Sequence, residues 1–317
     1  MVMNPRLREL ARRLPITSAY ERRIAELHGE LRQLRADTVV AGGEFVPPGH
    51  FYSAIPDRAE LKTRFAAVFE RDPLDIAGVD LRIDAQWALL EQLQPFLADV
   101  PFGEKPVGDL RYGYENGAYS YADGLFLHLM LRLLQPNRVI EVGSGHSSAC
   151  TLDTVGRFLN GKTRCTFVEP YDELLRSLLH PGDIDRVEIL TVPVQGVAVS
   201  RFAELEAGDV LFIDSTHVSK AGSDVNYLFF DVLPALASGV VVHVHDVFPS
   251  FEYPWDWVSE GRVWTEDYLL RAFLQYNSEF EVVLWPSLLA AAFPDRFFGA
   301  FPLAQRTTGG AIYLRRR

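Results

Sequence analysis

The 317-residue sequence predicts an α/β protein built on a Rossmann-like, seven-stranded, doubly wound sheet with an N-terminal helical extension. Two observations support this fold class. Short apolar runs alternate with helical patterns over residues 111–317, which is typical of a mainly parallel sheet covered by helices on both faces. One of these runs leads directly into a glycine turn and a helix, the beginning of a βαβ unit. The expected strands are residues 138–142, 164–168, 187–192, 209–213, 240–244, 280–284 and 311–314.

The first part of the chain, residues 1–36, is predicted to be an amphipathic helix. Ser18-Ala-Tyr-Glu21 has the form of a capping box at the start of a helix. Apolar residues then follow one another in steps of four and three, as in a heptad seam: Tyr20, Ile24, Leu27, Leu31 and Leu34. The pattern fits a helix that joins copies of the chain into a homo-oligomer, and equally a helix that lies across its own domain.

Residues 37–110 are expected to form a second extension, made of loops and short helices. Glycine and proline pairs punctuate its first part, and helical patterns occur around residues 58–70 and 84–98. Residues 111–317 then form the domain that contains the sheet.

Composition favours a soluble enzyme that acts on a small molecule or a sugar. Hydrophobic residues make up 48% of the chain and charged residues 23%, near the averages of globular proteins. No apolar run approaches the roughly 20 residues that a membrane span needs. The net charge of −11 disfavours duplex nucleic acid as a partner. The two cysteines, Cys150 and Cys165, fall in a predicted helix and strand, so we expect a reducing, cytoplasmic environment.

The most informative stretch is Arg138-Val-Ile-Glu-Val-Gly-Ser-Gly-His-Ser-Ser148. Gly143 and Gly145 let the backbone approach a ligand closely, because no Cβ stands in the way. Ser147 or Ser148 can cap the following helix, whose free N–H groups suit a carboxylate or another anion. Glu141 lies two residues before the first glycine, close enough to face the same ligand.

A second acidic residue, Glu169, ends the next apolar run. An acid about 20 residues beyond a glycine turn is the ribose-hydroxyl contact of nucleoside-binding βαβ units. The dinucleotide pattern G-x-G-x-x-G is incomplete here, because its third position is Ser148, and this weakens an NAD interpretation.

Polar residues also follow the fourth and fifth predicted strands, and parallel strands collect ligands at their carboxyl ends. Asp214, His245 and Asp246 should converge there. Two carboxylates and an imidazole form a reasonable site for a divalent cation such as Mg²⁺, Mn²⁺ or Fe²⁺. A cation there would lower the pKa of an acceptor's hydroxyl group. His217, three residues after Asp214, is well placed to accept the hydroxyl proton and is the predicted catalytic base.

The Glu-x-Gly-x-Gly sequence resembles motif I of the class I S-adenosylmethionine (SAM)-dependent methyltransferases. The resemblance covers roughly residues 111–317 and implies seven strands, of which the last is antiparallel. It implies that the turn Gly143-Ser144-Gly145, with Glu141 nearby, binds the methionine part of SAM, and that Glu169 binds the ribose. The chain differs from many members at Ser147, where they have a third glycine.

Asp-x-x-His after the fourth strand and an acidic or His-Asp pair after the fifth look like the bacterial metal-dependent sugar O-methyltransferases and the related cephalosporin-hydroxylase-like proteins. The likeness implies metal ligands at Asp214, His245 and Asp246, a base at His217, and Asp214 close to SAM. It also places the segment that contains Tyr121 and Asp123 near SAM, as further cofactor-binding residues. The characterised enzymes usually have a carboxylate at the position of His245.

The function implied is transfer of a methyl group from SAM to a hydroxyl group of a small molecule or sugar. Two alternatives stay open: a metal-dependent hydroxylase-like relative, and a non-catalytic protein that binds SAM or serves an assembly. Aromatic residues after the fifth strand are predicted to cover the acceptor, although a structural cluster would look the same: Phe248, Phe251, Tyr253, Trp255, Trp257 and Trp264.

Overall fold

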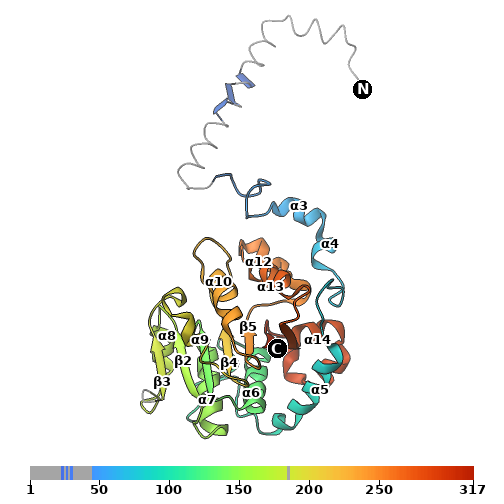
Figure 1. Ribbon diagram of the computed structural model, residues 1–317. Helices are drawn as coiled ribbons and strands as arrows, with labels where there is room; N and C mark the ends of the chain where they lie inside the picture. The colour runs from blue at the N-terminus through green and yellow to red at the C-terminus, as the bar shows by residue number, and fades with distance from the viewer. Residues whose placement is uncertain (1–22, 25, 28, 31–44, 184–185) are drawn as a thin grey trace, which may run out of the picture. The chain divides into compact units, whose positions relative to one another are not determined.

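The computed structural model describes residues 23–24, 26–27, 29–30, 45–183 and 186–317 (Figure 1). The chain divides into two compact units, residues 1–65 and residues 66–317. In the first unit, residues 23–24, 26–27 and 29–30 are helical, and most of the predicted heptad seam lies outside the described residues. Helix α3 (Arg58–Thr63) also belongs to this unit and is capped by Asp57, whose carboxylate accepts hydrogen bonds from two backbone N–H groups.

The second unit contains one seven-stranded sheet in the order β3-β2-β1-β4-β5-β7-β6. Strands β1 to β5 are parallel, and β7 is antiparallel to both β5 and β6. The predicted strands and the antiparallel last strand are confirmed, and no predicted boundary differs by more than two residues. The strands are β1 (Arg138–Val142), β2 (Arg164–Val168), β3 (Val187–Leu190), β4 (Val210–Ile213), β5 (Val241–Val244), β6 (Phe280–Leu284) and β7 (Ile312–Arg316).

Helices cover both faces of this sheet, as expected for a doubly wound fold (Figure 1). Alternate residues of a strand point to opposite faces, so Val210 and Phe212 of β4 join one apolar core while Leu211 and Ile213 join the other. The first core includes residues of α5 (Ile83–Leu93), α6 (Ala122–Leu134), α7 (His146–Phe158), α8 (Glu173–Leu178), α14 (Pro286–Ala292) and α15 (Pro294–Ala300). The second includes residues of α9 (Val199–Phe202), α10 (Asp224–Tyr227), α11 (Leu233–Ala235) and α13 (Glu266–Leu274).

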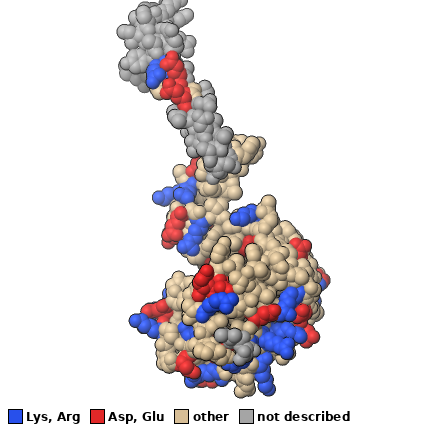
Figure 2. Space-filling model, turned by 90° about the vertical axis from the view of Figure 1, so that its left-hand side faces the viewer, with Lys and Arg blue, Asp and Glu red and all other residues tan. Residues whose placement is uncertain are grey.

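Two short helices complete the list: α4 (Phe65–Phe69) and α12 (Trp255–Glu260). None of the described helices is both long and apolar enough to cross a membrane. On the face shown in Figure 2, basic and acidic side chains lie interspersed.

Helix α5 is tied to the far edge of the sheet, although it lies about 200 residues earlier in the sequence. The buried side chain of Gln86 accepts a hydrogen bond of 2.7 Å from the backbone N–H of Trp285, just after β6. Arg82, which precedes α5, forms an ion pair of 2.8 Å with Glu281 of β6. Part of the segment predicted as a second extension therefore packs against the sheet. The domain boundaries at residues 36 and 110 remain predictions.

Candidate active site

A cavity of about 350 Å³ lies at the carboxyl ends of β1, β2 and β4. Three of the predicted cofactor-binding residues line it, namely Gly143, Glu169 and Asp214. Apolar side chains and backbone from the segment after β3 complete one wall, and the segment between β4 and α10 completes another. This is the place where parallel α/β sheets bind their ligands.

The glycine turn fits between the ends of two neighbouring strands. Gly143 has a left-handed backbone with φ of +83°, and a Cβ at this position would lie 1.7 Å from the carbonyl oxygen of Asp214. Its N–H donates to the carbonyl of Val168 at the end of β2, at 3.0 Å. Only glycine both adopts this left-handed backbone readily and leaves room for the carbonyl oxygen of Asp214. The turn therefore brings bare backbone to the rim of the cavity.

Glu141 lies inside the protein next to this turn and does not line the cavity. Its Oε1 accepts hydrogen bonds of 2.7 Å from the hydroxyls of Ser147 and Ser148. The two serines thus satisfy a buried carboxyl group. Gly145 stands at the N-cap of α7, and its N–H donates to the hydroxyl of Ser148 at 3.0 Å, so Ser148 also takes part in capping this helix, as expected. Burial raises the pKa of Glu141 to about 8.

Glu169 stands at the rim of the cavity, where its carboxylate is held by backbone N–H groups on both sides. Oε2 accepts from Ser144 at 3.1 Å, and Oε1 accepts from Tyr171 at 2.8 Å. The first bond connects the predicted ribose-binding acid to the glycine turn.

Two imidazoles face the same pair of carboxylates at the ends of β4 and β5. Nε2 of His217 lies 3.3 Å from Asp214 and 3.7 Å from Asp246. Nδ1 of His245 lies 3.4 Å from Asp214 and 3.7 Å from Asp246. The structure thus brings together all four residues predicted as base and metal ligands. Asp214 also lines the cofactor cavity, so the two sites adjoin.

The backbone is strained at two of these four residues. His217 and Asp246 both have left-handed conformations, with φ of 59° and 56°. Such residues are uncommon outside glycine and gather at functional sites. The carbonyl of His217 accepts the N–H groups of Thr265 and Glu266 at 2.9 and 3.1 Å, which fixes the start of α13 next to the site.

The close charges shift the pKa values of the whole cluster. Burial disfavours a charged His217, but its contacts with Asp214 and Glu266 outweigh burial and raise its pKa to about 10. Burial likewise opposes charge on His245, and the carboxylates around it raise its pKa well above the usual range. For Asp214 the effect of burial is outweighed by the two imidazoles, which lower its pKa. Burial raises the pKa of Asp246.

Glu266 is the residue that sequence reasoning missed. Its Oε2 lies 2.8 Å from Nδ1 of His217, and its side chain is almost completely buried. In the sequence, Glu266 and Asp267 look like ordinary acidic residues in the first turn of an exposed helix. No local pattern signals that both are buried.

Asp123 and Tyr121, predicted near the cofactor, do not line the cavity. Asp123 lies behind the cluster, where one oxygen is 3.5 Å from Nε2 of His245 and accepts the N–H of Gly310 at 2.9 Å. The hydroxyl of Tyr121 donates to Glu115 at 3.0 Å, and its ring stacks on Tyr114.

Four of the six aromatic residues predicted to cover the acceptor form a connected cluster beside His217, whereas Phe251 packs on Trp285 and Trp255 packs on Phe69. The ring of Trp264 is 4.4 Å from that imidazole between centroids. Trp257 and Tyr253 pack against Trp264 at 5.1 and 5.9 Å, and Phe248 packs against Trp257 at 4.9 Å. An acceptor that reaches His217 would therefore meet a partly exposed aromatic wall.

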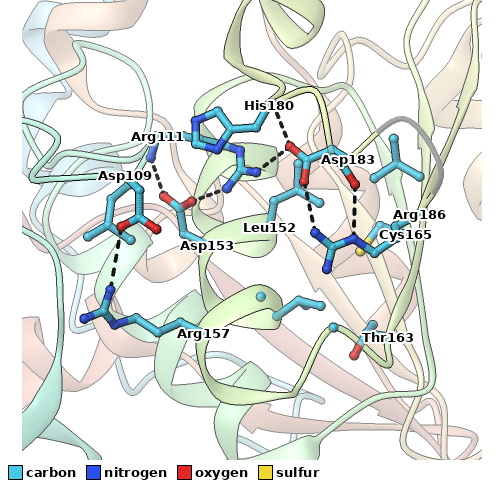
Figure 3. A pocket seen from close by; sticks show the side chains of 16 residues that line it. Asp109, Arg111, Leu152, Asp153, Arg157, Thr163, Cys165, His180, Asp183 and Arg186 are labelled. Atoms are coloured by element: carbon cyan, nitrogen blue, oxygen red, sulfur yellow. Dashed lines mark hydrogen bonds and ion pairs between the residues drawn. The ribbon is translucent and has the colours of Figure 1, made fainter.

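A second cavity of about 300 Å³ lies near the start of β2 and β3, away from the strands' carboxyl ends (Figure 3). Its centre is the buried side chain of Arg111, which bridges Asp153 and Asp183. Asp153 also accepts the backbone N–H groups of Arg111 and Tyr112, and Asp183 accepts that of His180. Because ion pairs and hydrogen bonds within the chain occupy both carboxylates, we interpret this network as one that stabilises the fold.

The residues around the cavity and the adjoining cluster fit the two groups predicted to bind here, a divalent cation and a nucleoside cofactor. Single ligand atoms of Asp214, His217 and Asp246 all lie within 4.8 Å of one another, which suits one cation. Neither ring nitrogen of the buried His245 has a hydrogen-bond partner among the described residues, although one faces the same carboxylates. The bare backbone of Gly143 and the carboxylate of Glu169 suit a nucleoside cofactor with a carboxylate-bearing tail.

Known proteins similar to the chain include methyltransferases. A family profile described as a methyltransferase domain matches residues 140–247, from β1 to just beyond β5. The chain is 34% identical over 169 residues to an uncharacterized protein of Archaeoglobus fulgidus, a match that covers 52% of this chain and 75% of that protein. The chain therefore resembles methyltransferases over residues 140–247.

Solved structures similar to the chain include a methyltransferase from Podospora anserina with S-adenosylhomocysteine bound, at 16% identity and a TM-score of 0.43. The similarity covers 84% of this chain and all of that one. Another is the O-methyltransferase TomG from Streptomyces achromogenes in complex with SAM, at 17% identity and a TM-score of 0.42, covering 81% and 95%. Likeness at this level is too slight to bear on substrate or mechanism.

Proposed function

We propose that the chain is a methyltransferase that transfers the methyl group of SAM to a hydroxyl oxygen of a small molecule or sugar, assisted by a divalent cation. The observation that carries the proposal is the position of Asp214. This residue lines the cavity at the glycine turn and also faces both imidazoles and Asp246. A methyl donor in the cavity and a hydroxyl group held at the cluster would therefore be neighbours.

In this proposal SAM occupies the cavity of about 350 Å³. Glu169 binds the ribose hydroxyls, and the backbone of Gly143, Ser144 and Gly145 surrounds the methionine part. Asp214 and Asp246 would hold a divalent cation, which would lower the pKa of the acceptor's hydroxyl group. The hydroxyl proton leaves to an imidazole of the cluster, which the sequence-based hypothesis identifies as His217. The aromatic wall of Trp257 and Trp264 binds the flat or apolar part of the acceptor.

The first experiment is calorimetric titration of the full chain with SAM and with NAD, each with and without Mg²⁺. We expect SAM to bind and NAD to bind weakly or not at all. Glu169→Gln should weaken SAM binding, whereas Glu188→Gln, an exposed position on the neighbouring strand β3, should not. Absence of SAM binding under every condition would contradict the proposal.

Transfer of radiolabelled methyl from SAM to a panel of hydroxylated sugars and aromatic compounds then tests the reaction. Activity without oxygen or reductant would argue against the hydroxylase-like alternative. SAM binding with no transfer to any acceptor would favour the non-catalytic alternative. Homo-oligomer formation through the N-terminal helix and a cytoplasmic location remain predictions.

A further inference from the structure

We infer that His217 is itself a ligand of the divalent cation, through Nε2 and together with Asp214 and Asp246, and that Glu266 holds its ring in place. The cation is then a transition metal such as Mn²⁺ or Fe²⁺ in preference to Mg²⁺. This inference rests on the proposed function and changes one part of it, because the sequence-based hypothesis gives Nε2 of His217 the acceptor's proton.

The distances around Nε2 fit a shared ion. Bonds of about 2.0–2.2 Å from a metal to nitrogen and oxygen place neighbouring ligand atoms about 3 Å apart. Nε2 of His217 lies 3.3 Å from Oδ1 of Asp214 and 3.7 Å from Oδ2 of Asp246. The three ligand atoms are all within 4.8 Å of one another. A single cation can therefore contact all three with small adjustments.

The other ring nitrogen of His217 is already engaged. Glu266, which is 1% exposed, lies 2.8 Å from Nδ1. A carboxylate can only accept a hydrogen bond, so Nδ1 carries a hydrogen. A cation that displaces the proton from Nε2 would meet the lone pair of this nitrogen beside Asp214 and Asp246. A carboxylate on the far nitrogen is the usual partner of a metal-ligating histidine, since it fixes the tautomer and the ring orientation.

A second observation points to a ligand at the same place. His245 is 4% exposed, and both its ring nitrogens lack a hydrogen-bond partner among the described residues. Its Nδ1 is aimed at the carboxylates of Asp214 and Asp246, at 3.4 and 3.7 Å. Buried polar atoms are normally satisfied, so an unpartnered imidazole directed at two carboxylates indicates a missing bound species.

The nitrogen ligand has two consequences. Imidazole suits transition metals such as Fe²⁺ and Zn²⁺, whereas Mg²⁺ prefers oxygen ligands. With Nε2 on the cation and Nδ1 bonded to Glu266, His217 has no lone pair left for a proton. The acceptor's proton then leaves to a group other than His217.

The test is Mn²⁺ binding to the metal-stripped full chain, followed by electron paramagnetic resonance. Pulsed spectra report whether an imidazole nitrogen is bound directly to Mn²⁺. We compare the wild type with His217→Gln and the matched variant His245→Gln, and we measure SAM binding by calorimetry to show that each variant is folded. Glu266→Gln tests the positioning role, and Glu260→Gln on exposed α12 is its control.

The wild type should bind Mn²⁺ more tightly than Mg²⁺ and show a coordinated nitrogen. His217→Gln should lose this nitrogen signal and bind Mn²⁺ at least tenfold more weakly, while His245→Gln keeps the signal. Glu266→Gln should weaken Mn²⁺ binding by about 10–100-fold and leave SAM binding unchanged. A nitrogen signal that persists in His217→Gln, a signal lost in His245→Gln, or no Mn²⁺ binding by the wild type would overturn the inference. Failure to find methyl transfer would leave these results intact and would count against the proposed function alone.

Discussion

Gly143 shows how one residue can fix the geometry of the cofactor cavity. Its left-handed backbone turns the chain out of β1, and its missing Cβ leaves room for the carbonyl of Asp214. The same residue therefore sets the distance between the glycine turn and the acid that adjoins the cation site. No other residue type can hold the two strand ends this close.

Gly143→Ala should destabilise the fold and abolish SAM binding. The added Cβ would lie 1.7 Å from the oxygen of Asp214 in a left-handed conformation, so the turn must move. We expect a loss of at least about 2 kcal/mol, measured by thermal unfolding, together with loss of the calorimetric signal for SAM. The control is Gly156→Ala on the exposed side of α7, where no atom lies within 4 Å of the new Cβ. That change should stabilise the chain by about 0.5–1 kcal/mol. Wild-type melting and SAM affinity in Gly143→Ala would refute the argument.

The raised pKa of Glu141 predicts that the stability of the fold depends on pH. Burial raises its pKa in the folded chain from the ordinary 4.5 to about 8. Between these two values the folded chain binds more protons at this residue than the unfolded chain does, so its contribution to stability falls as the pH rises. The contribution is fully present below pH 4.5 and is lost as the pH passes 8.

Glu141→Gln should therefore flatten the profile of melting temperature between pH 5 and pH 8. The exposed Glu91→Gln on α5 serves as the comparison and should follow the wild type. If Glu141→Gln lost as much stability over this pH range as the wild type, the carboxyl group would not be the cause.

The residues of the site differ in how far the sequence could predict them. Asp214, His217, His245 and Asp246 follow strand ends, and parallel strands bring their carboxyl ends together, so their convergence follows from the fold. Glu266 reaches His217 from a helix that is 49 residues further along the chain. Its place depends on how α13 packs, which no local spacing encodes.

At the scale of elements, ion pairs tie the segment before α6 to the sheet. Arg111 bridges Asp153 on α7 and Asp183 in the connection to β3 (Figure 3). All three side chains are at least nine-tenths buried. The pairing joins three parts of the chain that are 42 and 72 residues apart.

Arg111→Met should cost about 3–5 kcal/mol of stability, because it keeps the apolar stem but leaves two buried carboxylates without their cation. Chemical denaturation measures this change. Arg157→Met provides the matched control, since Arg157 forms an exposed pair with Asp109 at 3.9 Å and should contribute less than about 1 kcal/mol. Similar losses in the two variants would show that burial does not decide the effect.

The strands themselves were largely predictable, because each is a short apolar run covered on one or both faces. The order in which the strands pair in the sheet could not be predicted in this way. Periodicity alone cannot show that β7 lies between β5 and β6, since that order depends on contacts between residues more than 60 positions apart in the chain, such as Val244 and Ile312. The antiparallel last strand was implied by resemblance to a family.

For the whole molecule, the compact unit of residues 66–317 should be the smallest stable binding unit for SAM. A fragment of residues 66–317 keeps the contacts of α5 with the sheet, including the bond between Gln86 and Trp285. A fragment that begins at residue 111 loses these contacts, because it lacks α5 with its buried side chains Trp87, Leu90 and Leu93, and it exposes the apolar surface that they cover.

We expect the fragment 66–317 to unfold cooperatively and to bind SAM as the full chain does. The fragment 111–317 should melt at a clearly lower temperature or aggregate. Differential scanning calorimetry with and without SAM distinguishes the two. Equal stability of both fragments would mean that α5 is dispensable for the sheet.

The position of β7 has a consequence for how the chain reaches its folded state. Strand β5 is paired on one side by β4, but its other neighbour is made of residues 312–316, after all the other strands have been synthesised. Until then a nascent chain presents an open strand edge, which is prone to pair with other chains. The segment just before β7 also supplies Gly310, whose N–H bonds to Asp123 behind His245. Docking of this strand therefore completes the sheet and the surroundings of His245 in one late step. Ribosomes that stall before residue 312 would release chains that depend on chaperones.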